Sequence, residues 1–398
     1  MKVALVHDWL TGMRGGERCL ESFLAIYPDA DIYTLFHRPG STSALIDSRV
    51  VGVSFLNKLP GATRYYRALL PLFPLAIRQL KLRQDYDLVV SLSHAAAKNI
   101  SVPSGTKHIC YCFTPMRYIW DQAESYFGRI TPLLRPLIHY LRRWDKRGNK
   151  GVDRFVAISS FVAARIRRFY GRDADVVFPP VATSWIATAK SANTEAAFLY
   201  AGALVPYKRI ELILEAFVQS GLPLVVAGAG PLEKVLKAKS TPNIKFLGRV
   251  SDLELSSLYA SSRALVFAAR EDFGMIPVES LAAGTPVISA YDGALKESMA
   301  SISPWLRGPI DFSGSTGVFF KSPRRKSSDN QLLEALRFFL QHEEKFRSEV
   351  CVAHARKFSF ERFRSEWELI VDDLFRDSSA VRPRLSVGKY AQAEASAF

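Results

Sequence analysis

The sequence predicts an α/β protein built from two doubly wound domains, each with a mostly parallel sheet. At 398 residues the chain is too long for one compact core and suits two domains. Short apolar runs alternate with segments of helical periodicity along most of its length. Those runs are continuously apolar rather than alternating, as expected of strands buried on both faces by helices.

The N-terminal half contains the first alternating series. Residues 2–9 form an apolar run followed by a glycine-containing loop and an apolar-periodic segment, which predicts a strand, a loop and a helix. Further strands are expected at residues 30–36, 49–56, 87–93 and 107–113, and a strand followed by a helix at 153–171.

A change of composition at residues 176–196 predicts a linker, since Pro179 and Pro180 are followed by small and polar residues. A second series follows, with strands expected at 197–204, 222–230, 243–250, 263–269 and 285–291, and helices at 209–221, 231–240, 252–262 and 277–284. Amphipathic helices are expected at 330–358 and 360–376. The predicted domains are 1–183 and 184–358, with a helix at about 359–376 belonging to the first and a disordered tail at 377–398.

Composition excludes several classes of protein. Hydrophobic residues make up 48% of the chain and aromatic residues 12%, enough for a large core, so global disorder is excluded. No apolar run reaches the roughly 18–20 residues of a membrane-spanning helix. His7 and Asp8 interrupt the first apolar run too early for a signal peptide. The four cysteines have neither C-x-x-C nor zinc-site spacing, which favours a reduced, cytosolic compartment.

The net charge of +15 is concentrated in the N-terminal half. Residues 1–185 hold 26 Lys and Arg against 14 Asp and Glu, whereas the remainder holds 27 against 24. Residues 64–83 contain no acid, and residues 129–150 contain only Asp145. Both stretches interleave Arg with aromatic residues and Leu, which suits an anionic membrane surface or an acidic acceptor. A solvated basic face is an equal alternative. Nucleic acid is not an expected partner, because no recognised nucleic-acid-binding motif is present.

The most specific motif lies at residues 268–288. Glu271 and Glu279 are eight residues apart, and Gly274 and Pro277 lie between them. A carboxylate inside a helix beside a nucleotide site can accept hydrogen bonds from ribose hydroxyl groups, and one on the preceding loop can meet a donor sugar. Because glycine and proline accompany the two glutamates, we do not interpret them as two unrelated surface residues.

Three other motifs are weaker, and each has a structural alternative. Glycines in G-M-R-G-G-E-R, residues 12–18, follow the first strand and suit either an anion or a plain helix start. Lys208 and Arg209 follow a strand and suit either a diphosphate or solvent. Gly228 and Gly230 suit either a nucleotide or a tight turn, and taken alone the turn is favoured.

These motifs together resemble a known family. E-D-F-G-M-I-P-V-E-S-L-A-A-G-T-P-V-I resembles the E-x7-E motif of the retaining glycosyltransferases of family 4. R-G-G-E-R is similar to that family's N-terminal glycine loop, and L-V-P-Y-K-R-I-E-L-I-L-E-A-F to its phosphate-binding strand and helix. C-Y-C-F-T-P-M-R-Y-I-W-D, residues 110–121, resembles the acceptor-side segment of its bacterial surface-polysaccharide branch, often mannosyltransferases.

The resemblance, over about residues 2–375, implies the GT-B fold: two Rossmann-like domains facing a cleft, with the final helix crossing back to the first. It implies retaining transfer of a sugar, with mannose from GDP-mannose favoured, to a lipid-linked glycan. The setting implied is lipopolysaccharide or exopolysaccharide synthesis at the inner face of the cytoplasmic membrane. No metal or other cofactor is expected, because lysine and helix N-termini hold the diphosphate in such enzymes. The D-x-D pairs are therefore interpreted as coincidental.

The resemblance also implies a role for particular residues. Glu271 is the expected catalytic carboxylate, and His94, at the end of another strand, is a second catalytic candidate with a structural histidine as its alternative. The donor-side positions are Gly16, Lys208, Arg209, Gly228, Gly230, Arg249, Val250, Asp272, Phe273, Gly274, Met275 and Glu279. The acceptor-side positions are Gly15, Glu17, Phe113, Arg117 and Tyr118.

Two positions depart from the family pattern. Phe113 stands where members commonly have His, and Ala203 where many have Arg, although the neighbouring Arg209 could replace that cation. These departures support a second hypothesis, a degenerate subunit that binds nucleotide or glycan without turnover. A nicotinamide-dependent oxidoreductase is not favoured, because neither half contains G-x-G-x-x-G after a strand.

Overall fold

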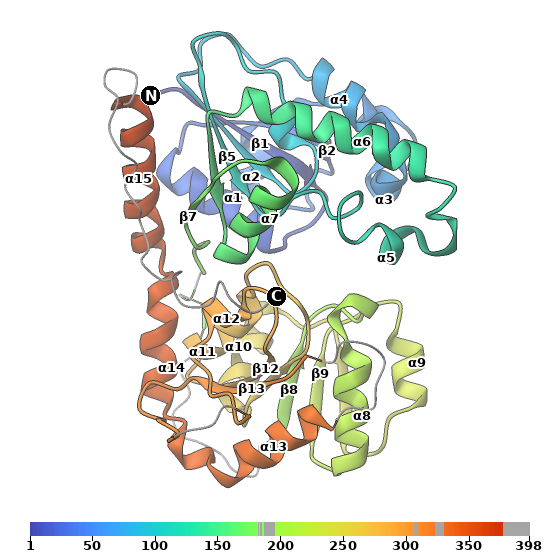
Figure 1. Ribbon diagram of the computed structural model, residues 1–398, viewed down its shortest axis with the longest axis vertical. Helices are drawn as coiled ribbons and strands as arrows, with labels where there is room; N and C mark the ends of the chain where they lie inside the picture. Colours follow the sequence, from blue (N-terminus) through green and yellow to red (C-terminus); the bar gives the residue numbers. More distant parts are fainter. Residues whose placement is uncertain (182, 184, 187–195, 306–308, 323–329, 377–398) are drawn as a thin grey trace. The chain divides into compact units, whose positions relative to one another are not determined.

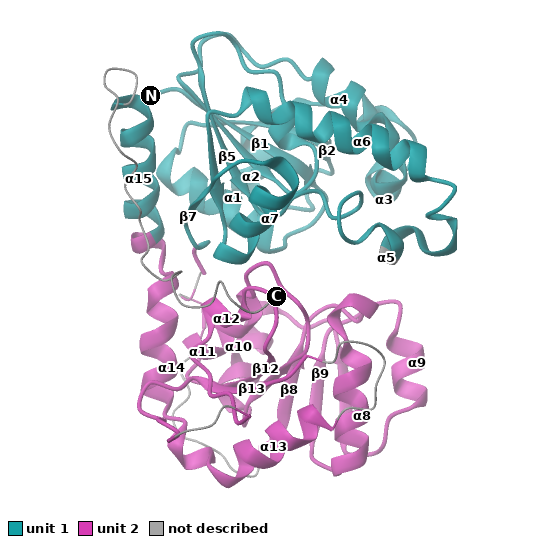
Figure 2. Cartoon of the chain, viewed as in Figure 1, with its two compact units in different colours: residues 1–179, 363–398 teal, residues 180–362 magenta. Residues whose placement is uncertain are grey.

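The computed structural model describes residues 1–181, 183, 185–186, 196–305, 309–322 and 330–376. The chain divides into two compact units (Figure 2), which comprise Met1–Pro179 with Phe363–Phe398, and Pro180–Arg362. The predicted tail at 377–398 and much of the predicted linker lie outside the described residues.

Unit 1 contains a seven-stranded parallel sheet in the order β3-β2-β1-β4-β5-β6-β7 (Figure 1). Its strands are β1 (Val3–Leu10), β2 (Asp31–His37), β3 (Val50–Val53), β4 (Leu88–Ser93), β5 (Lys107–Cys112), β6 (Arg154–Ala157) and β7 (Asp175–Val176). All of β1 and β4 is buried, which explains their continuous apolar pattern. The strand order reverses between β1 and β4, the position where doubly wound sheets bind ligands.

The helices of unit 1 include long amphipathic segments and several short ones. They are α1 (Gly15–Ile26), α2 (Ala44–Arg49), α3 (Ala62–Tyr65), α4 (Phe73–Gln79), α5 (Ala123–Phe127), α6 (Arg135–Arg147), α7 (Ser160–Tyr170) and, from Phe363 onward, α15 (Phe360–Arg376). Local signals set their ends. For example, Ser159 accepts a hydrogen bond from Val162 N at 3.1 Å at the start of α7, and Gly171 ends it at φ 66°.

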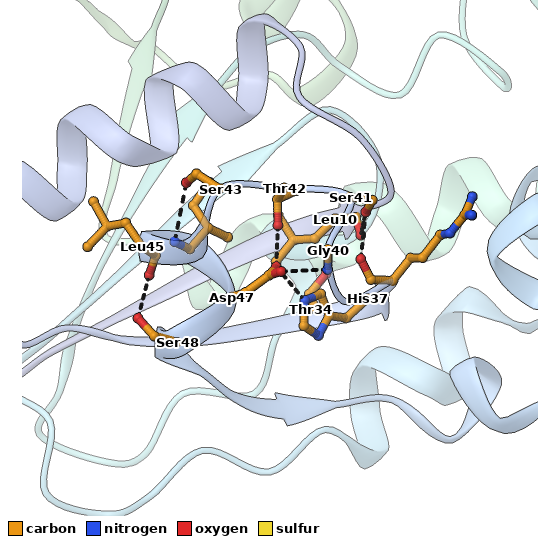
Figure 3. A network of polar contacts seen from close by, with 12 residues as sticks. Leu10, Thr34, His37, Gly40, Ser41, Thr42, Ser43, Leu45, Asp47 and Ser48 are labelled. Carbon is orange, nitrogen blue, oxygen red and sulfur yellow. Dashed lines mark hydrogen bonds and ion pairs between the residues drawn. The ribbon is translucent and has the colours of Figure 1, made fainter.

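The loop that leaves β2 is held by the carboxylate of Asp47 (Figure 3). That carboxylate accepts hydrogen bonds from Gly40 N at 2.7 Å and from Thr42 Oγ1 at 2.5 Å. Ser41 in the same loop donates to the Leu10 carbonyl at 3.4 Å, at the end of β1. The loop is therefore tied to the strand that precedes the glycine loop.

The chain's last described helix packs on the N-terminal sheet and its helices. Trp367 of α15 is fully buried, and its Nε1 donates to Tyr27 Oη at 2.9 Å. Its ring also packs edge-on against Phe23 of α1, with ring centroids 4.7 Å apart. The expected return of the final helix to the first domain is therefore what the structure has.

Unit 2 contains a six-stranded parallel sheet in the order β10-β9-β8-β11-β12-β13. Its strands are β8 (Phe198–Ala201), β9 (Leu224–Ala227), β10 (Ile244–Gly248), β11 (Leu265–Phe267), β12 (Val287–Ala290) and β13 (Gly317–Phe320). Its helices are α8 (Ile210–Ser220), α9 (Glu233–Ala238), α10 (Asp252–Ser261), α11 (Met275–Ala282), α12 (Leu295–Ser298), α13 (Gln331–Gln341) and α14 (Ser348–Ala355). The order reverses between β8 and β11, so the predicted α/β fold class is confirmed in both units.

Some elements differ from the sequence-based expectation. The strands β7 and β13 were not predicted, because β7 has two residues and β13 follows a stretch without helical periodicity. The single helix expected at 330–358 is two helices, α13 and α14. Between them lies a short turn that ends at Phe346, which is buried in the core. Within the described residues no helix is long and apolar enough to cross a membrane. The four cysteines are free and buried.

Candidate active site

In unit 2, Lys208 and Glu271 lie together at the point where the strand order reverses. Lys208 is in the loop after β8 and Glu271 in the loop after β11. Lys208 Nζ donates a hydrogen bond to Glu271 Oε1, and the two side chains are 15% and 17% exposed. The structure therefore brings together the predicted phosphate ligand and the predicted catalytic carboxylate. A charge-assisted pair of this kind is stronger than a neutral hydrogen bond.

The loop after Glu271 leads into the N-terminus of α11. Gly274 precedes the helix at φ 94°, in the left-handed region, and a Cβ there would lie 2.6 Å from Leu295 Cδ2. Met275 is the first helical residue, so its N–H has no intrahelical acceptor and suits an anionic oxygen. Asp272 and Phe273 are buried beside it.

Glu279 is in the second turn of α11 and is only 6% exposed. Its Oε2 accepts a hydrogen bond from the hydroxyl of Tyr259, at 2.9 Å, and Tyr259 itself is fully buried in α10. The predicted ribose ligand is thus already held by the protein through one of its oxygens, which fixes the carboxylate in position.

Arg209 lies beside a carboxylate that the sequence analysis did not single out. Its backbone has φ 52°, and among the described residues it is the one non-glycine residue with positive φ. Its guanidinium donates to Ser322 Oγ and lies 3.9 Å from Asp292, which follows β12. Arg270 Nε is 3.3 Å from the same carboxylate. Asp292 thereby anchors two cations close to the loop of Glu271.

The two glycines after β9 have a structural explanation. A Cβ on Gly228 would lie 1.8 Å from the carbonyl oxygen of Gly202, and one on Gly230 would lie 2.4 Å from that of Leu204. The loops after β8 and β9 therefore pack backbone against backbone, which agrees with the tight-turn interpretation. Arg249 is exposed and Val250 half-buried just after β10, at the same edge of the sheet.

In unit 1, Asp8 organises the loop that carries His94. Asp8 is fully buried in β1, and its carboxylate accepts hydrogen bonds from the backbone N–H groups of His94, Ala95, Ala96 and Ala97 at 2.5–2.8 Å. Asp8 Oδ2 also lies 3.2 Å from His94 Nδ1. Burial raises the pKa of Asp8, and the N–H groups of His94, Ala96 and Ala97 together with the charge of His7 oppose that shift.

His7, His94, Gly16 and Phe113 form a second cluster in unit 1. The ring centroids of His7 and His94 are 6.0 Å apart, and Phe113 lies 6.3 Å from the first and 6.2 Å from the second. A Cβ on Gly16 would be 3.3 Å from His7 Nε2 and 3.6 Å from Phe113 Cε2. Phe113, which lacks the expected imidazole, thus lies beside two imidazoles, one from β1 and one from the loop after β4.

The predicted acceptor-side residues lie beside this cluster, at the start of α1 and in the loop after β5. Gly15 is the first residue of α1, and Glu17, two residues later, is 3% exposed. Glu17 Oε2 accepts from Arg14 N at 3.1 Å, and burial raises the pKa of Glu17 to about 7. Arg117 and Tyr118 are half-buried in the loop after β5. Burial, followed by the charges of Arg117, Arg14 and Arg67, lowers the pKa of His94 to about 3.

Acidic side chains do not gather as metal ligands in the part of the chain that the structure describes, where no three His, Cys, Asp or Glu form a candidate set. The D-x-D pairs are engaged with cations or backbone instead: Asp29 with Arg49, Asp31 with Arg83, Asp85 and Asp87 with Lys2, Asp173 with Arg167, and Asp175 with Arg154.

Sequence reasoning missed His7, Asp8 and Asp292 as site residues. His7 and Asp8 were used only to reject a signal peptide. Two polar residues near the carboxyl end of a strand that is buried throughout are themselves a signal, because burying them requires partners. Asp292 follows the carboxyl end of another strand, β12, and the sequence analysis could have singled it out for that position.

Two family models match consecutive parts of the chain. Residues 29–185 match the model described as "Glycosyltransferase Family 4", and residues 182–349 match "Glycosyl transferases group 1". The first falls largely in unit 1 and the second in unit 2.

Curated relatives match part of the chain. The D-rhamnosyltransferase WbpZ of Pseudomonas aeruginosa is 31% identical over 176 residues, 40% of this chain and 46% of that protein. The O-antigen chain mannosyltransferase C of Escherichia coli is 32% identical over 24% of this chain and 28% of its own length. A GDP-mannose-dependent phosphatidylinositol dimannoside mannosyltransferase of Mycobacterium tuberculosis is 41% identical over 20% of this chain and 22% of its own. The matches span about half, or less, of these relatives.

Solved structures resemble most of the chain. Anabaena HepE in complex with UDP has a TM-score of 0.66 at 16% identity, covering 94% of this chain and all of that one. The sucrose-phosphate synthase of Thermosynechococcus elongatus has a TM-score of 0.70 at 14% identity, covering 95% and 100%. At these identities the likeness establishes the fold, which is GT-B.

Proposed function

The chain carries the two domains of a GT-B glycosyltransferase of the family 4 type, and on that premise we propose that it transfers a sugar from a nucleotide sugar to a lipid-linked glycan. The donor favoured is GDP-mannose, and the pathway is bacterial surface-polysaccharide synthesis. Of the three relatives described above, two are mannosyltransferases and one is a D-rhamnosyltransferase by name. HepE, whose fold is shared, was solved with UDP.

The observation that carries the proposal is the pairing of Lys208 with Glu271 beside the N-terminus of α11. In the proposed complex the diphosphate takes the place of Glu271 as the partner of Lys208, and the free N–H groups of α11 bind oxygen of the donor. Glu271 is then released toward the sugar, while Glu279, held by Tyr259, accepts from the ribose.

The reaction proposed is metal-free and retains the anomeric configuration. The leaving diphosphate gains negative charge as the glycosidic bond breaks, and Lys208 and the helix N-terminus stabilise that charge in place of a metal ion. Attack from the same face as the leaving group then lets the departing phosphate take the proton of the acceptor hydroxyl.

A thermal-shift panel tests the donor site. The protein is heated with GDP, UDP, ADP and dTDP and their common sugars, with and without EDTA, because a ligand that binds only the native state raises the melting temperature. We expect a selective shift that EDTA leaves unchanged. Lys208→Ala should lose the shift, whereas Lys239→Ala, an exposed lysine of the same unit, should keep it. A shift that requires a divalent ion would contradict the metal-free mechanism.

Unit 1 has a surface suited to the membrane that carries such an acceptor. The side chains of Tyr65, Leu72, Leu75, Ile130, Leu133 and Tyr140 are 40–80% exposed within the two basic stretches. Residues of α4 and α6 line one groove, so the two stretches lie side by side (Figure 1). Asp145, the one acid of the second stretch, is fully buried against Lys98 at 2.9 Å. Within the two stretches the exposed charge is therefore entirely basic, and we propose that they dock on anionic lipid. The exposed Asp153, outside both stretches, also lines the groove.

Vesicle co-sedimentation tests this docking surface. Vesicles of phosphatidylcholine with phosphatidylglycerol should bind the protein, and vesicles of phosphatidylcholine alone should bind it less. Leu133→Ser combined with Arg143→Gln should weaken binding, whereas Leu253→Ser, a leucine of unit 2 that is 77% exposed, should not. Equal binding to both vesicle types would contradict an electrostatic surface.

The second candidate function is a degenerate subunit that holds nucleotide or glycan without turnover. Phe113, in place of the family's usual histidine, is the observation that favours it. Nucleotide binding without hydrolysis or transfer, with any lipid-linked acceptor, would establish that alternative.

A further inference from the structure

Two imidazoles of unit 1 have ring nitrogens with no hydrogen-bond partner among the described residues. His7 is 1% exposed, and its Nε2 is buried and unpaired. His94 is 23% exposed at its side chain, and its contacts are with Asp8 and with neighbouring rings, none of them through Nε2. An unpaired polar atom in a buried position is costly and points to a group that the site binds.

The opposite nitrogen of each ring is anchored, which sets the tautomer. His7 Nδ1 lies 3.0 Å from the carbonyl oxygen of Trp9, and since a carbonyl can only accept, Nδ1 bears the proton. His94 Nδ1 lies 3.2 Å from the Asp8 carboxylate, which likewise favours the proton on Nδ1. In both rings Nε2 then carries no proton, and its lone pair can accept a hydrogen bond.

Both rings are neutral at physiological pH. Burial, followed by the charge of His94, lowers the pKa of His7 to about 4, and burial with three arginine charges lowers that of His94 to about 3. The charge of Asp8 opposes the shift at His7, and Glu17 lies on α1 beside Gly16. Neutral acceptors of this kind suit a hydroxyl group rather than an anion or a transferred proton.

We propose that His7 and His94 form a hydroxyl-binding site for the acceptor glycan, in which the two Nε2 lone pairs accept hydrogen bonds from sugar hydroxyl groups. The inference rests on the proposed function and adds the chemistry by which unit 1 binds its acceptor. Phe113 supplies an apolar ring beside both imidazoles, and glycine at position 16 keeps a methyl group away from His7 Nε2. On this proposal the two imidazoles beside Phe113 supply the polar groups that its own ring lacks.

The first test compares His94→Gln with His94→Asn. The amide of Gln reaches about as far as Nε2, whereas that of Asn reaches about as far as Nδ1, the nitrogen facing Asp8. We expect Gln to keep the acceptor KM within threefold and Asn to raise it tenfold or more, with donor binding unchanged in both. If His94 had only a structural role, Asn would be the better replacement. The substitutions would then change the melting temperature and not KM. Equal KM values for the two variants would overturn the proposal.

The second test does not need turnover. Protein labelled with ¹⁵N in histidine is titrated with the methyl α-glycosides of mannose, glucose, galactose and rhamnose, and the imidazole resonances are recorded. We expect at least one glycoside to shift the Nε2 resonances of His7 and His94 while Nδ1 stays protonated. Gly16→Ala, whose methyl group would lie 3.3 Å from His7 Nε2, should abolish the shift at His7. Gly151→Ala, where a Cβ meets nothing within 4 Å, is the control.

The outcomes separate this inference from the proposed function. Glycoside-induced shifts in a protein that transfers no sugar would support the hydroxyl site and overturn the enzymatic function. Transfer of a sugar with no shift at either imidazole for any of the four glycosides would support the enzymatic function and overturn the hydroxyl site.

Discussion

Lys208 and Glu271 each provide the other's counter-charge, so a substitution of either changes the other's environment. We expect Lys208→Ala to weaken nucleoside diphosphate binding by about tenfold to a hundredfold, since a charge-assisted hydrogen bond contributes about 1.5–3 kcal/mol. Glu271→Gln should bind the diphosphate as well as the wild type or better, but turn over far more slowly. Calorimetric titration and initial rates measure the two effects. Equal affinities for the wild type and Lys208→Ala would remove the phosphate role.

Glu17 makes the stability of unit 1 depend on pH. Its pKa is about 7 in the folded protein against an ordinary value of 4.5, so between these values the native state binds more protons than the unfolded state. The free energy of unfolding should therefore fall as pH rises from 4.5 to 7, by about 3 kcal/mol. In Glu17→Gln this part of the decline should disappear. Urea unfolding at pH 5 and 7.5 measures it, with Glu21→Gln on the same helix as the control. An unchanged pH slope in Glu17→Gln would refute the assignment.

At the scale of elements, the loops after β8 and β9 depend on glycine for their mutual contact. Gly228→Ala would place a methyl group 1.8 Å from the Gly202 carbonyl oxygen, at φ 151°. We expect a loss of stability on the order of 3 kcal/mol, from overpacking and backbone strain together. Gly221→Ala, at φ 69° with nothing within 4 Å, isolates the strain and should cost about 1 kcal/mol. Denaturant unfolding compares them, and equal losses would show that the contact contributes nothing.

The alternating strands and helices are the part of the fold that the local sequence pattern predicted best. Strands buried on both faces must be continuously apolar, so β1, β4 and β5 were recognised from composition alone. The short β7 and the helix break between α13 and α14 have no such local signature. The strand β7 pairs with β6, and the residue at the end of the helix break, Phe346, is buried in the core; both contacts are with parts of the chain that no local pattern includes.

At the scale of the whole molecule, α15 joins the last described part of the chain to the first unit. Trp367 is fully buried, whereas Leu369 on the same helix is 60% exposed. We expect Trp367→Ala to destabilise the protein by about 3–5 kcal/mol, through the cavity it leaves and the loss of its bond to Tyr27. Leu369→Ala should change stability by less than about 0.5 kcal/mol. Thermal unfolding of both variants checks this, and similar losses would argue against the packing of α15.

The sequence by itself determined the fold class, the two βα series and the E-x7-E motif, because periodicity and motif spacing are properties of neighbouring residues. It also pointed to Lys208, Glu271 and Glu279 as a group, although only through resemblance. The tertiary structure decided which of these side chains meet. It paired Lys208 with Glu271 and Tyr259 with Glu279, and it placed Asp8 under the loop of His94. These contacts join residues from different elements, either in parallel strands and the loops after them or, for Tyr259 and Glu279, in two neighbouring helices. Which strands become neighbours depends on how the whole sheet packs, and no local pattern encodes that.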